Sequence, residues 1–465
     1  MFLKKFIGSR RFYRAVLGVA IPIMVQTGIT NFVSLLDNIM VGQVGTESMS
    51  GVSIVNQFIF IFNLLIFGAI SAAGIFTSQF HGYGDTDGVR HTFRFKLYIN
   101  LMAGAAGILV FYFFGTDLIH LFLHEGAEGD LALTLAEGQK YLKVMLWGLI
   151  PYAISQVYAS TVRETGDSLM PMIASVTAVV TNCILNLILI FGYLGAPALG
   201  VTGAAVATVI SRFVELGILL IAVHTRQKKY PFIKGAFRSL RVPKTLMLRI
   251  AVKGLPLMVN EFFWSIAITM RNQCYSTRGL DVVAAQNIQS TLFNVFSVVY
   301  MAFGTAIAVV VGNQLGAGRF EEARDSARKM QALSVFFGIL MGGVLCAVSA
   351  VFPLLYDTTP DVRALATQLI IISALNMPFN AYAHATYFTL RSGGKVFVTF
   401  LFDSAYMWAV VLPLAAGIAY LTELPILVLF AIAQWVEILK CIFGFLFLKR
   451  GTWVKQLVAD EKLKS

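Results

Sequence analysis

PIMVQTGITNFVSLLDN at residues 22–38 is answered by PLMVNEFFWSIAITMRN at residues 256–272. Both stretches begin with proline, end with asparagine and are largely apolar. The match continues at the same separation of 234 positions without a gap. Its further pairs are Gly45 with Gly279, Ile54 with Ile288, Phe62 with Phe296, Ala72 with Ala306, Gly82 with Gly316, Gly84 with Gly318 and Arg90 with Arg324. The first half of the chain therefore repeats in the second half.

Composition places this repeat in a membrane. Of the 465 residues, 57% are hydrophobic and only 13% are charged, whereas a soluble domain carries roughly 25% charged residues. The mean hydropathy of +0.76 is too high for one soluble core. Apolar stretches of about 20 residues recur along the chain, and they lack the alternation of a β-barrel. We therefore expect an all-α integral membrane protein. Doubled membrane proteins are most often transporters, because two similar halves can rock around a shared cavity.

The apolar stretches predict twelve transmembrane helices. Two six-helix lobes with an even number of spans each share one orientation, so a pseudo-twofold axis along the membrane normal relates them. The expected domains are an N-lobe at 1–223, a linker at 224–248, a C-lobe at 249–450 and a tail at 451–465. The expected spans are 15–42, 51–79, 96–123, 140–162, 168–192, 201–224, 249–275, 283–312, 328–355, 362–390, 395–420 and 424–449.

Charge predicts the orientation and excludes other classes. The net charge of +12 comes from loops on one expected side of the membrane, which argues against nucleic acid as a partner. Because basic loops stay cytoplasmic, we expect a multi-pass protein of the inner membrane with both termini in the cytoplasm. The four cysteines are scattered, without metal-type spacing or a disulfide framework. No Ser-His-Asp set or paired catalytic carboxylates appear, so we expect neither an enzyme nor a cofactor.

Asp37 is the most informative polar residue of the first half, because it interrupts an apolar run. An ionisable group in a bilayer costs several kcal/mol and is a functional candidate by default. It serves either as a proton carrier or as the ligand of a bound cation; the alternative is a structural acid bonded to neighbouring helices.

Asn182 and Asn186 lie four residues apart on one helix face, and Thr208 follows in the next span. These oxygens predict a cage for a small hard cation or a hydrogen-bond relay for a proton, although such residues also bond neighbouring helices.

The second half carries a different set of candidates. Asn260, Glu261 and Trp264 precede Arg271, which matches Asp37 in the repeat. Glu261 and Arg271 are ten residues apart, about 15 Å along a helix and on different faces, so we expect no direct pair. We expect Glu437 to pair locally with Lys440, three positions on. Further candidates for a substrate or proton site are Gln286, Asn287, Asn380, His384 and Asp403.

Taken together, these motifs resemble the multidrug and toxic compound extrusion (MATE) family over about residues 12–449. The resemblance is carried by Ile21-Pro22 with Asp37 and Val41-Gly42, the Gln79–Gly84 turn, Arg163-x-x-Gly166 with Pro171, Asn182-x-x-x-Asn186, Gly203–Thr208, Gly254-Leu-Pro256, Gly312–Gly316 and Leu390-Arg391. It implies two six-helix lobes that export organic, cationic or amphipathic compounds against inward flow of Na⁺ or H⁺. It also implies a monomer among membrane lipids, without a cofactor.

The resemblance further implies that Asp37, Asn182, Asn186 and Thr208 form the N-lobe cation site. The family often has Asp where this chain has Asn186, so one negative charge is missing and the choice between Na⁺ and H⁺ stays open. In the C-lobe, Glu261 comes about one turn earlier than the acid of a well-known bacterial branch, and Asn380 with Ala381 replaces a second acid. The alternatives are a lipid-precursor flippase of the same superfamily, a lipid-modifying membrane enzyme, and a sensor or scaffold.

Overall fold

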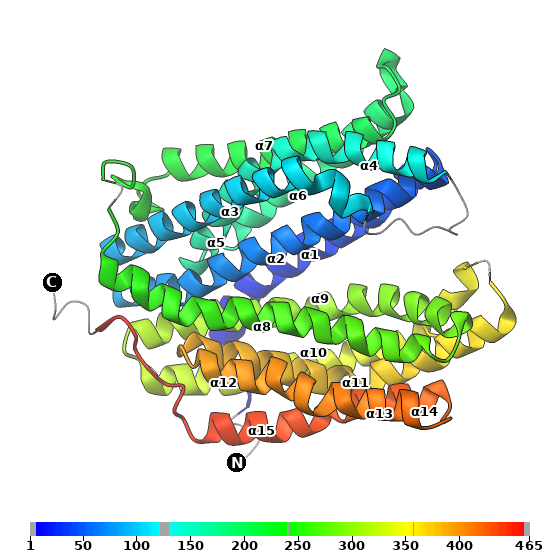
Figure 1. Ribbon diagram of the computed structural model, residues 1–465. Helices are drawn as coiled ribbons and strands as arrows, with labels where there is room; N and C mark the ends of the chain where they lie inside the picture. Colours follow the sequence, from blue (N-terminus) through cyan, green and yellow to red (C-terminus); the bar gives the residue numbers. More distant parts are fainter. Residues whose placement is uncertain (1–5, 121–129, 240, 357, 460–465) are drawn as a thin grey trace. The chain divides into compact units, whose positions relative to one another are not determined.

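The computed structural model describes residues 6–120, 130–239, 241–356 and 358–459, and these ranges are helical without a β-strand. In the first half a short 3₁₀ turn at Leu146–Gly148 separates two helices, α4 and α5. The helices of this half are α1 (Arg10–Gly42), α2 (Thr46–Tyr83), α3 (Thr86–His120), α4 (Leu131–Met145), α5 (Leu149–Glu164), α6 (Leu169–Phe191) and α7 (Val201–Thr225), as labelled in Figure 1.

The second half begins with four long helices, and its interruptions fall in the last two spans instead. Figure 1 shows α9, α10 and α11 as long helices, and the span after them contains two π-helical segments, at Leu401–Ala405 and Met407–Val411. The helices of this half are α8 (Lys244–Ser276), α9 (Leu280–Gly316), α10 (Phe320–Val348), α11 (Pro360–Ser392), α12 (Val396–Phe400), α13 (Leu412–Leu421), α14 (Ile426–Trp435) and α15 (Glu437–Lys449).

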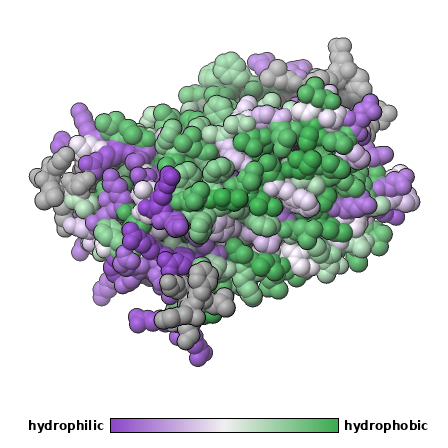
Figure 2. Space-filling view, turned by 90° about the horizontal axis from the view of Figure 1, so that it is seen from below, coloured by the Kyte–Doolittle hydropathy of each residue, from purple (hydrophilic) through white to green (hydrophobic). Residues whose placement is uncertain are grey.

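The predicted fold class is confirmed, because the described part of every expected span lies on a helix or on consecutive helical segments. Residues 121–123 of the expected span 96–123 lie outside the described residues. Among the described residues, 10 helices are long and apolar enough to cross a membrane. Two expected spans fall outside that set for physical reasons. The 3₁₀ turn divides one of them into short helices, and α8 carries Lys253, Glu261 and Arg271 within its apolar sequence. Figure 2 shows apolar side chains over the middle of one face and hydrophilic ones towards its ends.

Packing divides the chain into two compact units, each described here by itself. We call residues 25–77 and 85–250 the N-unit, and residues 1–24, 78–84 and 251–465 the C-unit. The first residues of α1 and the last turn of α2 thus pack with the second half of the chain. The lobe boundaries expected from the sequence, at 223, 248 and 450, stay a prediction.

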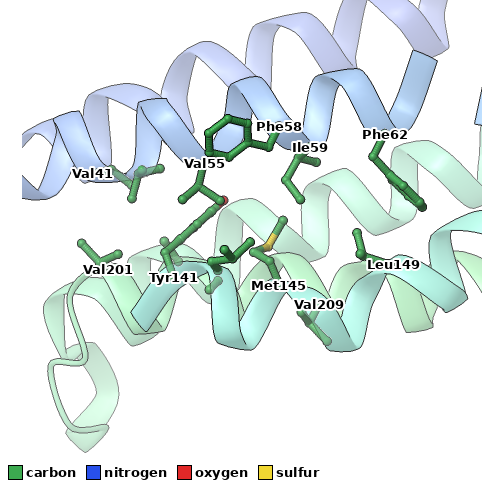
Figure 3. Close-up of a cluster of buried hydrophobic side chains, with 14 of the residues drawn as sticks. Val41, Val55, Phe58, Ile59, Phe62, Tyr141, Met145, Leu149, Val201 and Val209 are labelled. Atoms are coloured by element: carbon green, nitrogen blue, oxygen red, sulfur yellow. The ribbon is translucent and has the colours of Figure 1, made fainter. Parts of the chain in front are cut away.

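The core of the N-unit joins α2, α4, α5 and α7. Val55 and Phe58 of α2 meet Tyr141 and Met145 of α4 in a buried cluster, which Val209 of α7 joins (Figure 3). Burying such side chains stabilises the fold by about 1.5–3 kcal/mol each. In the C-unit, a second cluster joins the start of α1 to α9, α10 and α11, and a third packs α8 and α9 against α11, α13 and α14.

Candidate functional site

The N-unit brings its four predicted residues together on three helices. Asn186 of α6 donates from Nδ2 to Oδ1 of Asp37 on α1, at 2.6 Å. One turn earlier on the same face, Asn182 donates from Nδ2 to the Thr208 hydroxyl on α7, at 3.2 Å. The two amides also meet, with 3.4 Å between Nδ2 of Asn186 and Oδ1 of Asn182. The helical spacing of the two asparagines therefore aims both side chains at one carboxylate.

The amide of Asn182 fits this site in two orientations. When its oxygen and nitrogen are exchanged, Nδ2 donates to both carboxylate oxygens of Asp37, at 3.1 and 2.9 Å. Oδ1 then accepts from the Thr208 hydroxyl at 3.2 Å. The same side chain thus presents either a hydrogen-bond donor or an oxygen to the centre of the cluster, because an amide has both.

Close packing of α6 on α7 sets the position of Thr208. A Cβ at Gly203 would overlap the backbone carbonyl of Leu189, so only glycine permits this approach of the two helices. Small residues at helix contacts allow such close backbone approach in membranes. In the first orientation of Asn182, Thr208 donates its proton to the Ala204 carbonyl at 3.0 Å and accepts from the Asn182 amide with a lone pair of its hydroxyl.

The two asparagines of the cluster are buried, whereas Asp37 and Thr208 are half-buried. Asn182 is 6% exposed and Asn186 is 1% exposed. Oδ1 of Asn186 is buried and accepts no hydrogen bond from the described part of the chain. The carboxylate, two amide oxygens and one hydroxyl are hard ligands of the kind that small cations prefer. The same groups can instead hold a proton on Asp37, so the chemistry of the site fits both.

The C-unit gathers acids and bases into a second cluster. Lys440 of α15 lies 2.5 Å from Oδ1 of Asp403, and Asn260 of α8 donates to Oδ2 of the same carboxylate at 3.2 Å. Ser404 donates to Oδ1 of Asn260 at 2.8 Å. Asp403 and Ser404 stand in the π-helical segment Leu401–Ala405. Single π-helical turns often mark functional positions in helices.

Glu261 reaches this cluster through a tyrosine. Tyr387 of α11 donates to Oε1 of Glu261 at 3.1 Å, and Asn260 donates to the hydroxyl of Tyr387 at 3.4 Å. Arg391, one turn along α11, lies over the Tyr387 ring at 5.9 Å. A continuous chain of hydrogen bonds therefore links Glu261 to Asp403. Sequence reasoning predicted three of its members separately: Asn260, Glu261 and Asp403.

The prediction of a local pair between Glu437 and Lys440 is wrong. Arg271 of α8 binds Oε1 of Glu437 at 2.9 Å, while Lys440 turns to Asp403 on another helix. A partner on a neighbouring helix is available here because the span is packed inside the protein, whereas an isolated helix offers only partners three or four residues away. As expected, Arg271 does not pair with Glu261.

The remaining predicted residues lie apart from these hydrogen-bonded clusters. Trp264 is exposed, and Asn287 is exposed on α9. Gln286 donates to Asn272 at 2.9 Å, Asn380 is half-buried, and His384 packs its ring against Tyr300 and Phe388 at 5.5 and 4.9 Å.

Sequence reasoning missed Tyr387, Ser404 and Lys440 as members of the C-unit cluster. Lys440 carried a usable signal, because it is a charge in the middle of the apolar stretch 424–449, and such charges are costly unless paired within the protein. Tyr387 and Ser404 gave no signal. Tyrosine and serine are common in membrane helices as packing or helix-bonding residues.

Comparison with known protein families finds one family model that matches the chain twice, once in each half of the repeat. The MatE family model matches residues 22–188 and again residues 256–433. The chain is 25% identical over 452 residues to a Thermotoga maritima protein named "Probable multidrug resistance protein NorM", a match that covers 96% of this chain and 94% of that protein. It is also 25% identical over 366 residues to "Multidrug resistance protein MdtK" of Yersinia pestis, covering 78% of each chain.

Solved structures share the fold. A mutant of the Vibrio cholerae MATE transporter VcmN superposes with a TM-score of 0.85 at 19% identity, and the match covers 96% of this chain and 98% of that one. A transporter of the MOP superfamily from Pyrococcus furiosus gives a TM-score of 0.83 at 19% identity, covering 97% and 98%. At this level of identity the likeness concerns the arrangement of the helices.

Proposed function

We propose that this chain, which belongs to the MatE family of multidrug efflux transporters, is an antiporter that exports organic compounds in exchange for an inward-moving Na⁺ or H⁺. Relatives such as NorM and MdtK are named for multidrug resistance, and they are transporters, not enzymes. The proposal places the chain in the cytoplasmic membrane with both termini in the cytoplasm, since the basic loops lie on that side. The flippase alternative is not favoured by these comparisons.

One observation carries the coupling proposal: Asp37 is surrounded by uncharged donors. Its hydrogen-bond partners among the described residues are the amides of Asn186 and Asn182, and no ion pair with Asp37 occurs among them. A carboxylate in an apolar helix is stabilised by a counter-charge, a proton or a bound cation. With no built-in counter-charge, binding of an ion from solution changes the energy of this site strongly.

The four residues then have distinct roles. Asp37 supplies the charge that takes up the proton or cation. Asn182 and Asn186 either donate to the carboxylate or, after rotation of the amide, turn an oxygen towards a cation lying beside it. Thr208 adds a hydroxyl oxygen. Exchange follows when the ion-bound and ion-free forms of this cluster favour different conformations, because a ligand shifts an equilibrium only through its different affinities for the two states.

Among the substrate or proton candidates of the second half, we assign that role to Glu261 of the C-unit cluster, with Asn260 and Asp403 beside it. Here Asp403 and Glu437 already have basic partners, Lys440 and Arg271. Glu261 has a tyrosine hydroxyl as its hydrogen-bond partner, which makes it the acid of this unit best suited to attract an organic cation or a proton. We assign Asn260 and Asp403 to holding that arrangement in place.

The test is substitution of Asp37 by Asn, which removes the charge and keeps the size. Purified protein in proteoliposomes is given a cationic dye inside and an imposed sodium gradient or, separately, a pH gradient. We expect gradient-driven dye efflux to fall at least about tenfold, equivalent to about 1.4 kcal/mol or more. Asp117→Asn is the matched control, because Asp117 is an exposed acid at the end of α3. Full efflux by Asp37→Asn would exclude Asp37 as the coupling group.

A further inference from the structure

The last turn of α2 and the last turns of α9 cross inside the C-unit at matched glycines. A Cβ at Gly82 would overlap the backbone carbonyl of Asn313, and a Cβ at Gly316 would overlap the backbone carbonyl of Gln79. Gln79 and Asn313 are 234 positions apart, as are Gly82 and Gly316. The two contacts are therefore equivalent under the repeat. In each of them, a glycine of one half packs on the helix backbone of the other half.

A third contact belongs to the same crossing. A Cβ at Gly312 would lie 2.9 Å from Cβ of Ser78, its own repeat equivalent. The two helix ends thus approach each other closely at these three positions. Small residues at a helix contact permit such close approach. They also leave two smooth surfaces that can separate without first pulling a large side chain out of a pocket.

The C-terminal segment 451–459 lies against this crossing and binds both of its helices. Gln79 is fully buried, and its Nε2 donates to the carbonyls of Ser392 at 2.9 Å and Lys455 at 3.2 Å. Its Oε1 accepts from the backbone N–H of Leu457 at 2.6 Å. One side chain therefore ties the end of α2 to the end of α11 and to the tail.

The tail also binds the other helix of the crossing. Gln456 donates to the carbonyl of Gly316 at 2.6 Å. Trp453 is 3% exposed and packs in the same buried cluster as Leu315 of α9 and Leu390 of α11. Its backbone carbonyl lies so close to Gly393 that a Cβ there would overlap it. The segment is thus a strap across α2, α9 and α11.

We propose that the α2–α9 crossing is a releasable closure of the transport pathway and that the strap 451–459 is its latch. The proposal rests on transport by alternating access, as proposed above. Residues 46–77 of α2 belong to the N-unit and residues 78–84 to the C-unit. A rocking motion of one unit must therefore bend α2 or release its last turn, and the smooth glycine contact is the easier element to break.

Two features make release inexpensive and reversible. At the end of α2 the strap is held through a single amide, that of Gln79, which makes two hydrogen bonds to it, at Lys455 and Leu457. Charged groups lie next to the crossing: Lys253 donates to the carbonyl of Gly394 at 2.9 Å, and Arg319 begins α10 directly after the α9 turn. Water that reaches these polar ends can satisfy the backbone groups that opening exposes.

The decisive experiment locks the crossing. Ser78→Cys and Gly312→Cys are combined in a chain whose four native cysteines are replaced by serine, and dye efflux from proteoliposomes is measured before oxidation, after oxidation and after reduction. A disulfide needs Cβ atoms about 3.8 Å apart, so the helices must part by roughly 1 Å to form it. We expect oxidation to reduce efflux at least about tenfold and reduction to restore it. Each single variant should show the same efflux after oxidation as before it, because neither can form the disulfide.

Efflux that continues unchanged in the cross-linked protein would show that the crossing is a permanent joint, which overturns the proposal. Failure of the transport proposal looks different, because the unmodified chain would then show no gradient-driven efflux at all.

The latch is tested by a measurement that does not depend on transport. Ser392→Cys, at a position 2% exposed, is labelled with a water-soluble maleimide with and without Gln79→Ala.

We expect Gln79→Ala to accelerate this labelling at least about fivefold, because the strap loses its hold on α2. An unchanged rate would exclude the latch. Gly82→Ala and Gly316→Ala should accelerate it to similar extents, since they break the same contact from its two sides. Gly417→Ala is the matched control: a Cβ there meets nothing within 4 Å.

Discussion

Two clusters of this transporter, one in each unit, surround a half-buried aspartate in opposite ways. In the N-unit, Asp37 is held by two asparagine amides. In the C-unit, Asp403 has a lysine at 2.5 Å and Glu437 has an arginine at 2.9 Å. The halves repeat each other in sequence, yet Asp37 has neutral neighbours in the first cluster, whereas Asp403 and Glu437 have basic partners in the second.

This difference decides which carboxylate gains free energy when it binds a proton or cation from solution. A buried ion pair is already neutral overall, so a proton or cation from solution gains little by binding there and must first displace the basic partner. A carboxylate surrounded by neutral amides gains much more from the same ion. Repeats that fold alike can therefore divide their work between coupling and structure through a few side chains.

The largest expected effect comes from removing the partner of Asp403. Lys440→Met leaves this carboxylate buried without its counter-charge, because both side chains of the pair are less than one-fifth exposed. Breaking such a pair costs about 3–5 kcal/mol. We expect a drop of many degrees in the melting temperature of the purified protein. Lys440→Met combined with Asp403→Asn should recover most of the loss, and Asp37→Asn alone should leave the melting temperature nearly unchanged.

If Lys440→Met melts like the unchanged protein, the C-unit pair is not a structural charge pair, and the contrast between the units disappears.

A smaller effect is expected from restoring the charge that the N-unit lacks. Asn186→Asp sets a second carboxylate within hydrogen-bond distance of Asp37, where the amide nitrogen now lies at 2.6 Å. Two neighbouring carboxylates repel, and a cation between them relieves the repulsion. We expect the concentration of Na⁺ that half-maximally raises the melting temperature to fall at least about tenfold, about 1.4 kcal/mol. Asn182→Asp tests the neighbouring position in the same way. If choline raised the melting temperature of Asn186→Asp as much as Na⁺ does, the prediction would be contradicted.

The smallest effect concerns an acid with a basic partner outside the apolar spans. Burial acts to raise the pKa of Asp167, but hydrogen bonds from Lys229 and Tyr230 outweigh it and hold that pKa below its ordinary value. A lowered pKa means that folding favours the ionised form, so the stabilisation is present at neutral pH and is lost as the pH falls below about 4. We expect Asp167→Asn to cost about 1 kcal/mol at neutral pH.

The measurement is the melting temperature of both proteins between about pH 7 and pH 3. The difference should shrink towards acid pH, because protonation removes the charge of Asp167 in the unchanged chain. A difference in melting temperature that stays constant over this range would show that the charge of Asp167 contributes nothing to stability. The pair Lys229–Asp167 could then not be compared with the buried ion pairs.

The N-unit site was predictable because its signals are local. Asp37 stands out as a charge in an apolar run, and the spacing of Asn182 and Asn186 places them on one helix face. The C-unit cluster was predictable only in part. Asn260, Glu261 and Asp403 stand out as polar residues, but they are connected through Tyr387 of α11, and Asp403 is paired with Lys440 of α15. Both partners come from other helices.

The amino-acid sequence by itself determined that the chain is helical, doubled and bound for a membrane, because length, hydropathy and repeat spacing act along the chain and need no knowledge of distant contacts. Only the tertiary structure decided which charge meets which. Glu437 and Lys440 are three residues apart and yet bind different helices. An ion pair is chosen by distance in space, and many partners at long sequence separation are compatible with the same apolar pattern. The α2–α9 crossing shows the same limit, since matched glycines mark a repeat in the sequence but reveal their mutual contact only in the folded protein.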